Sequence, residues 1–324
     1  MVRTRRDVGV SMQGVILTAG EGTRLLPLTR RRSKAMLPVL GKPLAERVLT
    51  DLYLKGVTDF VVVVSPEDDE IVQHFRRLPN VEVRFVYQAE PLGMADALRR
   101  AAPLIEGSFI LAACDNLVSA AHVGRMLEAW HSVPRPSAVL TLTPVEQERL
   151  GSVGIVEMEG PWITRILEKP SPEEAPSNIC SVPLYIFSPR ILAYLSEIPL
   201  SPRGEYEIQD AIQMLIEREG YVGGVLTPHR WTVTRPADLL TVNRYFLRQE
   251  GSRIAPGDLG IGTQLITPLW IDPGVSIGAE CVIGPEVYLE GGCRVGDGVT
   301  LRNAVVLRNA TVNGGTTFVD SVIA

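Results

Sequence analysis

The sequence has little of what marks several classes of protein. Its 324 residues include only four cysteines and 6% aromatic residues, and 37 Asp and Glu outnumber 32 Lys and Arg. No stretch approaches the roughly 20 apolar residues in a row that span a bilayer. The formal net charge of −5 argues against a nucleic-acid-binding protein, which usually has a basic face. We therefore expect neither a membrane nor a nucleic acid as partner.

The cysteines favour a reducing compartment. They form no CxxC pair, and their spacing matches neither a zinc site nor a disulfide framework. Their positions are Cys114, Cys180, Cys281 and Cys293. We expect buried thiols in a cytoplasmic protein.

The start of the chain resembles a secretory signal only in part. Three arginines precede an apolar run, but Ser11 and Gln13 interrupt that run, and it leads directly into a glycine-rich loop. We interpret residues 1–12 as a leader that the fold does not need.

Residues 13–250 alternate between short apolar runs and amphipathic segments. Continuous apolar strands separated by helices predict a mostly parallel sheet covered on both faces, which is an α/β, Rossmann-like domain. Ligands bind such sheets beyond the carboxyl ends of the strands. The strands expected first are 14–18, 60–64, 83–87, 109–113 and 138–143; mixed strands near 153–157, 162–167 and 183–187 and helices near 206–219 and 237–249 follow.

The segment 251–324 contains a repeat of six residues. Aliphatic residues recur at every sixth position. Each member of a second apolar series lies two residues before a member of the first series. Such a period, with Gly beside an aliphatic residue, predicts a short left-handed parallel β-helix of hexapeptide repeats. The first series is Ile271, Ile277, Ile283, Leu289, Val295, Leu301 and Leu307; the second is Val275, Cys281, Val287, Cys293, Val299 and Val305.

The first expected strand leads into a glycine-rich loop, LTAGEGTRLLPLT (17–29). Gly20 and Gly22 let the backbone bend sharply and bring its N–H groups close to an anion. Arg24 adds a fixed positive charge that can bind phosphate oxygens. The amino-acid sequence of the loop differs from both the dinucleotide-binding fingerprint and the Walker motif. The loop therefore predicts a phosphate site of another kind.

The segment ILTAGEGTRLLPLTRRRSKAMLPVLGKPL (16–44) resembles the opening of the sugar-nucleotide pyrophosphorylases, such as glucose-1-phosphate thymidylyl- and uridylyltransferases. The likeness extends over residues 14–250, and the β-helix resembles that of the longer family members. The resemblance implies transfer of a nucleotidyl group from a nucleoside triphosphate to a sugar 1-phosphate, with release of pyrophosphate. Positioning and charge neutralisation are what this reaction asks of a protein.

Three catalytic residues follow from the resemblance. Arg24 would hold the leaving pyrophosphate, and Lys34 would neutralise the α-phosphate. Asp115, at the carboxyl end of an expected strand, would bind Mg²⁺ together with phosphate oxygens, the ligands that this cation prefers.

Base recognition is implied for YQAEPLGMADA (87–97). Gln88 would face the base edge with a donor and an acceptor, which favours uracil or thymine, hence dTTP or UTP. Gly93 would give the base room against the backbone. The further nucleotide contacts implied are Leu17, Ala19, Gly20, Gly22 and Thr23.

The resemblance also implies a pocket for the sugar phosphate, with glucose 1-phosphate favoured. Gly154 would touch sugar hydroxyls through its backbone. In ILEKP, Glu168 would accept hydrogen bonds from sugar hydroxyls and Lys169 would bind the phosphate. The further sugar contacts implied are Asn178, Tyr185 and Glu207, whereas Asp210 is expected to be structural.

Two departures from the family pattern leave an alternative open. Thr232 and Thr234 fall at or near the position of a second metal ligand, and neither is a good ligand for Mg²⁺. Pro183 replaces a glycine and removes one backbone donor from the sugar pocket. The chain is thus either a working enzyme with an altered metal site or a nucleotide-sugar-binding regulatory or scaffold subunit. The retained charged residues favour catalysis.

The β-helix has no expected chemistry of its own. All four histidines lie outside the repeat, so an acyltransferase would lack its usual general base. We expect the β-helix to serve assembly or regulation, in a homo-oligomer.

Overall fold

The computed structural model describes residues 12–255 and 257–324, so the expected leader lies outside the described residues except for Met12. The chain divides into two compact units. We call residues up to Gly20 together with Ala45–Arg230 the sheet unit. Glu21–Leu44 together with Trp231–Ala324 form the β-helix unit. Each unit is described by itself.

The sheet unit is built on a nine-stranded sheet with the order β5-β4-β1-β6-β11-β8-β12-β10-β9. Strand β1 pairs in parallel with β4 and β6, β4 with β5, and β8 with β12, whereas β11 runs antiparallel to β6 and β8. The strands are β1 Gln13–Leu17, β4 Asp59–Val64, β5 Glu82–Tyr87, β6 Phe109–Ala113, β8 Ala138–Pro144, β9 Gly154–Glu159, β10 Trp162–Glu168, β11 Ile179–Phe187 and β12 Val222–Leu226; the short β7 is Asn116–Leu117. The bounds of β1, β4, β5, β6, β8, β9 and β10 lie within two residues of the expected strands. Strand β11 begins four residues before the expected 183, and β7 and β12 were not predicted.

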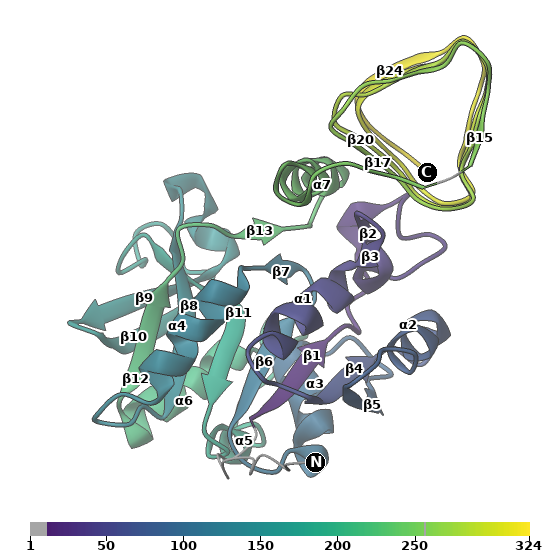
Figure 1. Ribbon diagram of the computed structural model, residues 1–324. Helices are drawn as coiled ribbons and strands as arrows, with labels where there is room; N and C mark the ends of the chain where they lie inside the picture. Colours follow the sequence, from purple (N-terminus) through teal and green to yellow (C-terminus); the bar gives the residue numbers. More distant parts are fainter. Residues whose placement is uncertain (1–11, 256) are drawn as a thin grey trace. The chain divides into compact units, whose positions relative to one another are not determined.

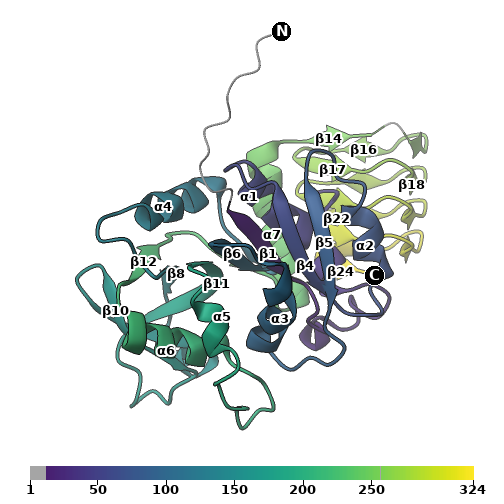
Figure 2. The same cartoon turned by 90° about the horizontal axis from the view of Figure 1, so that it is seen from below.

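Helices cover both faces of this sheet. Figure 2 shows α3, α5 and α6 on one face and α1 and α4 on the other. Fully buried aliphatic residues of the central strands pack on α3 and α6, which explains why those strands are apolar at every position. The helices are α1 Leu44–Tyr53, α2 Asp69–Phe75, α3 Met94–Ala101, α4 Ala120–Trp130, α5 Ile191–Tyr194 and α6 Ile208–Glu219.

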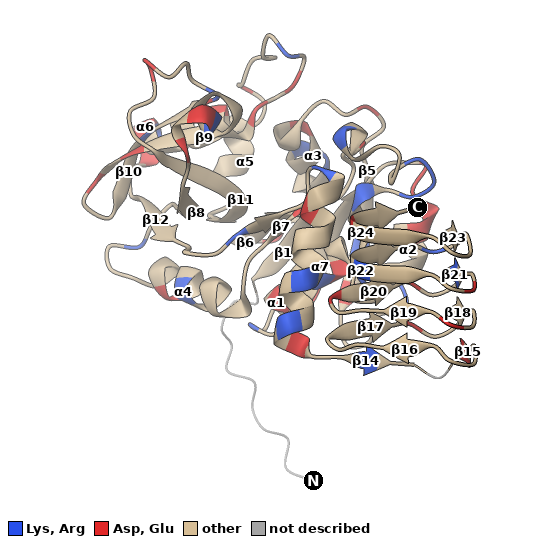
Figure 3. Ribbon diagram, turned by 90° about the horizontal axis from the view of Figure 1, so that it is seen from above, with Lys and Arg blue, Asp and Glu red and all other residues tan. Residues whose placement is uncertain are grey.

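The β-helix unit is a triangular coil seen along its axis in Figure 1 and from the side in Figure 2. Its three faces are stacks of short parallel strands. The strands are β14 Arg253–Ile254, β15 Asp258–Leu259, β16 Gln264–Leu265, β17 Leu269–Ile271, β18 Ser276–Ile277, β19 Val282–Ile283, β20 Val287–Leu289, β21 Arg294–Val295, β22 Thr300–Val306, β23 Thr311–Val312 and β24 Thr317–Ile323. Figure 3 shows these faces as mostly uncharged ribbon. The predicted parallel β-helix is confirmed.

The last coil corrects the expected repeat. From β17 to β20 the partner of Leu269 is Val287, whereas from β20 to β22 the partner of Val287 is Ala304. The first step spans 18 residues (287 minus 269) and the second only 17 (304 minus 287), so one residue is lost at the corner before Ala304. As a result Ala304 joins the interior cluster and Val305, predicted to face inward, does not, although it is buried. Leu307 leaves the interior series for the same reason.

Helix α7 (Pro236–Glu250) packs against β22 and β24, which accounts for apolar residues on the outside of the last coil. The same helix contacts β2 (Pro38–Val39), which forms a hairpin with β3 (Lys42–Pro43). The amide of Asn243 is the polar link: its Oδ1 accepts from the Leu40 N–H at 3.0 Å, and its Nδ2 donates to the Pro38 carbonyl at 3.1 Å. Residues 21–44 thus belong physically with the β-helix. The expected boundary near 250 is not where the compact units divide.

The four cysteines are buried thiols, as expected. Among the described residues, no helix is both long and apolar enough to cross a membrane.

A buried histidine makes stability depend on pH. His122 of α4 is fully buried, and burial, assisted by Arg125, lowers its pKa from 6.5 to about 4. Its Nε2 lies 2.9 Å from the Thr141 hydroxyl. Between these two pKa values the unfolded chain binds a proton that the folded chain does not, so the free energy of unfolding falls as the pH falls.

We expect His122 to reduce the free energy of unfolding by about 2 kcal/mol between pH 7 and pH 5. Urea unfolding at both pH values, compared with His122→Gln, measures this contribution because glutamine does not titrate. An identical pH dependence in the two proteins would show that folding does not lower the pKa of His122.

Candidate active site

The glycine-rich loop and Lys34 come together within the β-helix unit. Gly22 has φ 63°, and a Cβ placed on it would lie 3.0 Å from the Cβ of Lys34. The Gly22 carbonyl accepts the Thr29 hydroxyl at 3.0 Å and the Leu25 N–H at 2.9 Å, which closes the loop. A larger residue at position 22 would push Lys34 away. Glycine is therefore needed here both for its conformation and for the close approach.

The two predicted cations begin or line short 3-10 turns. Arg24 is exposed in the turn Thr23–Leu25, and Lys34 is half-buried at the start of the turn Lys34–Met36. The predicted nucleotide contacts at the end of β1, namely Leu17, Ala19 and Gly20, belong to the sheet unit, whereas Gly22, Thr23, Arg24 and Lys34 belong to the β-helix unit.

The amide of Gln88 has a fixed direction. Its Nε2 donates to the Gly93 carbonyl at 3.1 Å and to Oδ2 of the buried Asp96 at 2.9 Å. Both acceptors need N–H donors, so the network assigns the nitrogen to this side. Gln88 then presents Oε1, an acceptor, and not the donor-and-acceptor pair expected from the sequence. An imide N–H, as in uracil or thymine, is a matching donor.

Gly93 is needed by the fold at its own position. Its φ is 94°, and a Cβ placed on it would lie 2.7 Å from the Tyr206 carbonyl oxygen. That carbonyl accepts the Ala95 N–H at 3.1 Å. The start of α3 is thereby fixed against the segment before α6. Asp96, which orients Gln88, was missed by the sequence reasoning because it reads as an ordinary acidic residue in a first helical turn.

Asp115 stands just beyond the carboxyl end of β6, as predicted, and is half-buried. The Asn116 Nδ2 donates to its Oδ1 at 3.0 Å, and the Asn116 Oδ1 accepts from Arg230 Nε at 3.0 Å. Burial lowers the pKa of Arg230, and the negative charge of Asp115 partly counteracts this. Asn116 and Arg230 orient and balance the carboxylate. Nothing in the sequence singles out Arg230 from the other arginines.

At the position where a second metal ligand was expected, Thr234 contributes to the start of α7 instead. Both the N–H and the hydroxyl of Thr234 donate to Oδ2 of Asp238 at 2.8 Å. The Arg235 N–H donates to the same oxygen at 2.8 Å. Asp238 therefore caps the start of α7. Among the described residues, no group of three or more His, Cys, Asp or Glu is placed to hold a metal.

The predicted sugar side contains two buried acceptors without donors. The atoms are Glu168 Oε2 and Gln209 Oε1. A Cβ placed on Gly154 would lie 3.0 Å from Glu168 Oε2, 3.1 Å from Gln209 Cγ and 3.2 Å from the Ser181 hydroxyl. These groups therefore converge on Gly154, and a side chain there would fill the space between them. A buried acceptor without a donor costs free energy until a donor reaches it.

Cations stand beside these acceptors. Glu168 Oε1 lies 3.5 Å from Lys169 Nζ and 3.4 Å from Arg203 Nη2. Arg203 also donates to Glu207, whose Oε1 accepts the Ser201 hydroxyl at 2.9 Å. Burial raises the pKa of Glu168, while Lys169 and Arg203 lower it in part. Nothing in the sequence singles out Arg203, although it lies in the same RGEYEIQD segment as Glu207.

The structure corrects the predicted role of Tyr185, whereas that of Asn178 stays a prediction. Tyr185 is fully buried, burial raises its pKa, and its hydroxyl donates to Ser181 at 3.1 Å. It therefore supports Ser181 from within the core and has no surface for a sugar. Asn178 is exposed, and only its carbonyl has an assigned role, accepting the Val145 N–H at 2.9 Å. Pro183 sits where the pairing of β11 with β8 shifts register, a place where a strand tolerates proline.

The sequence matches a known family over most of its length. Residues 13–249 match the family model described as nucleotidyl transferase, and residues 265–324 match one described as GMPPB C-terminal domain. The chain belongs to the nucleotidyl transferase family, and it is an enzyme of the nucleotidyltransferase class.

Several relatives of the chain have names that specify a sugar 1-phosphate as substrate. A glucose-1-phosphate thymidylyltransferase of Streptomyces griseus is 31% identical over 301 residues, which are 91% of this chain and 81% of the relative. The UTP–glucose-1-phosphate uridylyltransferase AglF of Haloferax volcanii is 35% identical over 207 residues, 63% of this chain and 84% of the relative. A solved UDP-glucose pyrophosphorylase complexed with UDP-glucose has TM-score 0.67 and 20% identity, over 74% of this chain and 99% of that chain. The structural likeness confirms the Rossmann-like fold.

Proposed function

We propose that the protein transfers a nucleotidyl group from dTTP or UTP to a sugar 1-phosphate, with glucose 1-phosphate as the favoured acceptor. The observation that carries this proposal is the pairing of hydroxyl acceptors with cations in the sheet unit. Glu168 Oε2 and Gln209 Oε1 lack donors, and Lys169 and Arg203 stand beside Glu168. A sugar phosphate supplies hydroxyl donors for the first pair and an anion for the second.

On the nucleotide side, each group binds the part of the nucleoside triphosphate that its chemistry suits. The backbone around Gly20 and Gly22 receives phosphates through its N–H groups, together with Leu17, Ala19 and Thr23. Arg24 binds the departing pyrophosphate. Lys34 neutralises charge on the α-phosphate as the sugar phosphate oxygen attacks. Gln88 accepts a hydrogen bond from the pyrimidine, beside the turn at Gly93.

Mg²⁺ fits the donor set around Asp115. One carboxylate, with phosphate oxygens and water as the remaining ligands, is a usual environment for this ion. When bound, the ion would neutralise charge on the phosphates. Asn116 Nδ2 donates to Oδ1 of this carboxylate at 3.0 Å and so orients it. Thr232 and Thr234 take no part, and in this proposal the enzyme works with one protein carboxylate.

Two further proposals concern the cellular compartment and the oligomeric state. The buried thiols are compatible with the cytoplasm as the place of action. We also propose a homo-oligomer, with the β-helix as the surface for assembly.

The substrate assignment is tested by pyrophosphate release. With Mg²⁺ we expect turnover for dTTP or UTP with glucose 1-phosphate, and little with CTP, because N3 of cytosine carries no hydrogen that Gln88 Oε1 could accept. A panel of nucleoside triphosphates against several sugar 1-phosphates measures this. Glu168→Gln should raise the KM for the sugar phosphate and leave that for the nucleotide unchanged. No turnover with any pair, while calorimetry still detects nucleotide-sugar binding, would favour the regulatory or scaffold subunit.

A further inference from the structure

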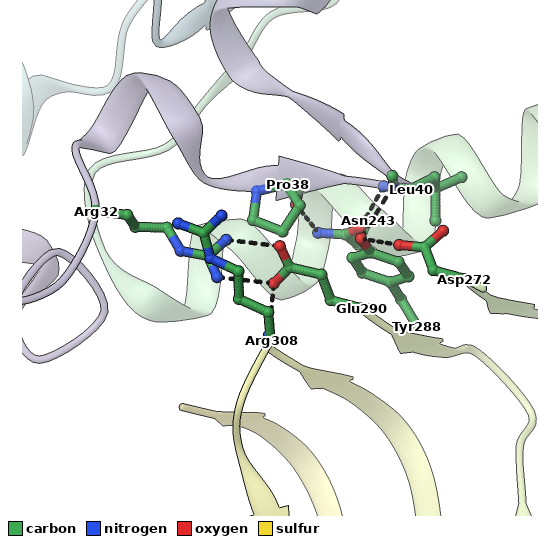
Figure 4. Close-up of polar contacts among 9 residues, drawn as sticks. Arg32, Pro38, Leu40, Asn243, Asp272, Tyr288, Glu290 and Arg308 are labelled. Carbon is green, nitrogen blue, oxygen red and sulfur yellow. Dashed lines mark hydrogen bonds and ion pairs between the residues drawn. The ribbon is translucent and has the colours of Figure 1, made fainter. Parts of the chain in front are cut away.

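The segment that carries Lys34 is held on one side by a salt bridge to the β-helix. Glu290, which follows β20, accepts two hydrogen bonds from the Arg32 guanidinium: Nη1 to Oε1 at 2.8 Å and Nη2 to Oε2 at 3.0 Å (Figure 4). The Arg308 N–H donates to Oε2 at 2.7 Å and fixes the carboxylate on the next coil. The side chains of Arg32 and Glu290 are only 5% and 14% exposed, so water competes little for the pair. Two parallel bonds fix orientation as well as distance.

The other side of the segment is held by Tyr288, a residue of β20 itself. Its buried hydroxyl donates to Asp272 Oδ2 at 2.8 Å and accepts the Gly41 N–H at 3.1 Å (Figure 4). Asp272 Oδ1 accepts from Trp270 Nε1 at 2.9 Å, so the carboxylate cannot rotate away without losing a bond. Gly41 has φ 76°, and a Cβ placed on it would lie 2.9 Å from Asp272 Oδ1. The contact therefore has a defined direction and little free space.

Lys34 lies between these two anchors and has no long flexible link to either. It is two residues after Arg32, and its carbonyl accepts the Leu37 N–H at 3.1 Å in the turn that leads to β2. Asn243 of α7 then holds Pro38 and Leu40. Backbone hydrogen bonds at Ser33, Lys34, Pro38 and Leu40 therefore restrain the path between the two anchors. A shift of β20 would therefore move the backbone of Lys34.

We propose that Glu290 and Tyr288 of the β-helix are positioning residues for Lys34, so that the β-helix takes a direct part in nucleotidyl transfer. This rests on the role given to Lys34 in the proposed function. It extends the expectation that the β-helix serves assembly or regulation, because the same coil sets the place of a catalytic charge.

The test uses the full chain with the substitutions Glu290→Gln and Glu286→Gln. Glu286 precedes β20 and accepts from Arg248 Nε of α7 at 2.7 Å, so the second variant removes a more exposed ion pair on the same coil without touching residues 21–44. A charge displaced by about 1 Å costs catalysis roughly 100-fold. We expect Glu290→Gln to lower kcat about 10- to 100-fold, with an unchanged KM for the sugar phosphate. Glu286→Gln should stay within about twofold of the natural protein.

A double variant separates positioning from general damage. Lys34→Met combined with Glu290→Gln should be no slower than Lys34→Met alone, because Glu290 acts only through Lys34. A double variant slowed by the product of the two single effects would overturn the proposal. Equal losses in Glu290→Gln and Glu286→Gln would overturn it as well, since both would then reflect a weakened β-helix.

A second measurement needs no turnover and so distinguishes failure of this proposal from failure of the proposed function. Amide hydrogen exchange of residues 33–41 should quicken in Glu290→Gln and in Tyr288→Phe but not in Glu286→Gln. If the natural protein shows no turnover with any substrate pair, the proposed function fails, and this exchange still decides whether the β-helix holds the segment. Unchanged exchange in both anchor variants would refute the positioning role.

Discussion

Asp115→Asn is expected to lower kcat about 1,000-fold, equivalent to about 4 kcal/mol of transition-state stabilisation. Asparagine has nearly the same shape, and its Oδ1 can still accept from Asn116 Nδ2, so the local hydrogen bond is kept. What is lost is the negative charge that a divalent cation needs in a site with one protein carboxylate. Turnover at saturating Mg²⁺ and substrates measures the effect.

Two controls accompany this variant. Asp258→Asn makes the same chemical change at an exposed position of β15 and should leave kcat unaltered. Nucleotide binding in the presence of a chelator should be equal in the natural protein and Asp115→Asn, because Asp115 acts on the nucleotide through the ion. Full activity of Asp115→Asn would show that Asp115 does not bind the metal ion.

Leu301→Ala is expected to destabilise the β-helix by about 3 kcal/mol. Leu301 is fully buried and pairs with Ile283 on one neighbouring coil and with Phe318 on the next. Removing its side chain leaves a cavity in the centre of the stack, where each coil depends on its neighbours. Urea unfolding followed by circular dichroism measures the loss.

The matched control is Leu259→Ala, in β15 of the same β-helix. Leu259 is 51% exposed, so the same truncation removes little buried contact and should cost less than about 0.5 kcal/mol. Equal effects of the two substitutions would mean that burial within the stack does not set the cost of removing a leucine side chain.

Much of the fold could be predicted from local pattern. The apolar runs at 60–64 and 109–113 became the buried strands β4 and β6, because a strand covered on both faces needs apolar residues throughout. The six-residue period predicted the interior of the β-helix up to Leu301. The period failed at Val305, because a residue lost at one corner reverses which side chains face inward.

The candidate site could be predicted only in part. The sequence indicated Asp115 at a strand end and Glu168 beside Lys169, since these follow from position along one strand. It did not indicate that Tyr185 is enclosed, that Gln88 presents an acceptor, or that Arg203 bridges Glu168 and Glu207. Each of these depends on a neighbour from another element.

The sequence by itself therefore determined which elements form and which face of each is apolar, because periodicity within an element records its burial. Only the tertiary structure decided what packs on each face. Arg32 meets Glu290 across 258 residues of sequence, and that contact joins residues 21–44 to the β-helix. No local pattern can encode such a pairing, since either residue alone reads as an ordinary surface charge. Burial of the two together is what makes the contact specific.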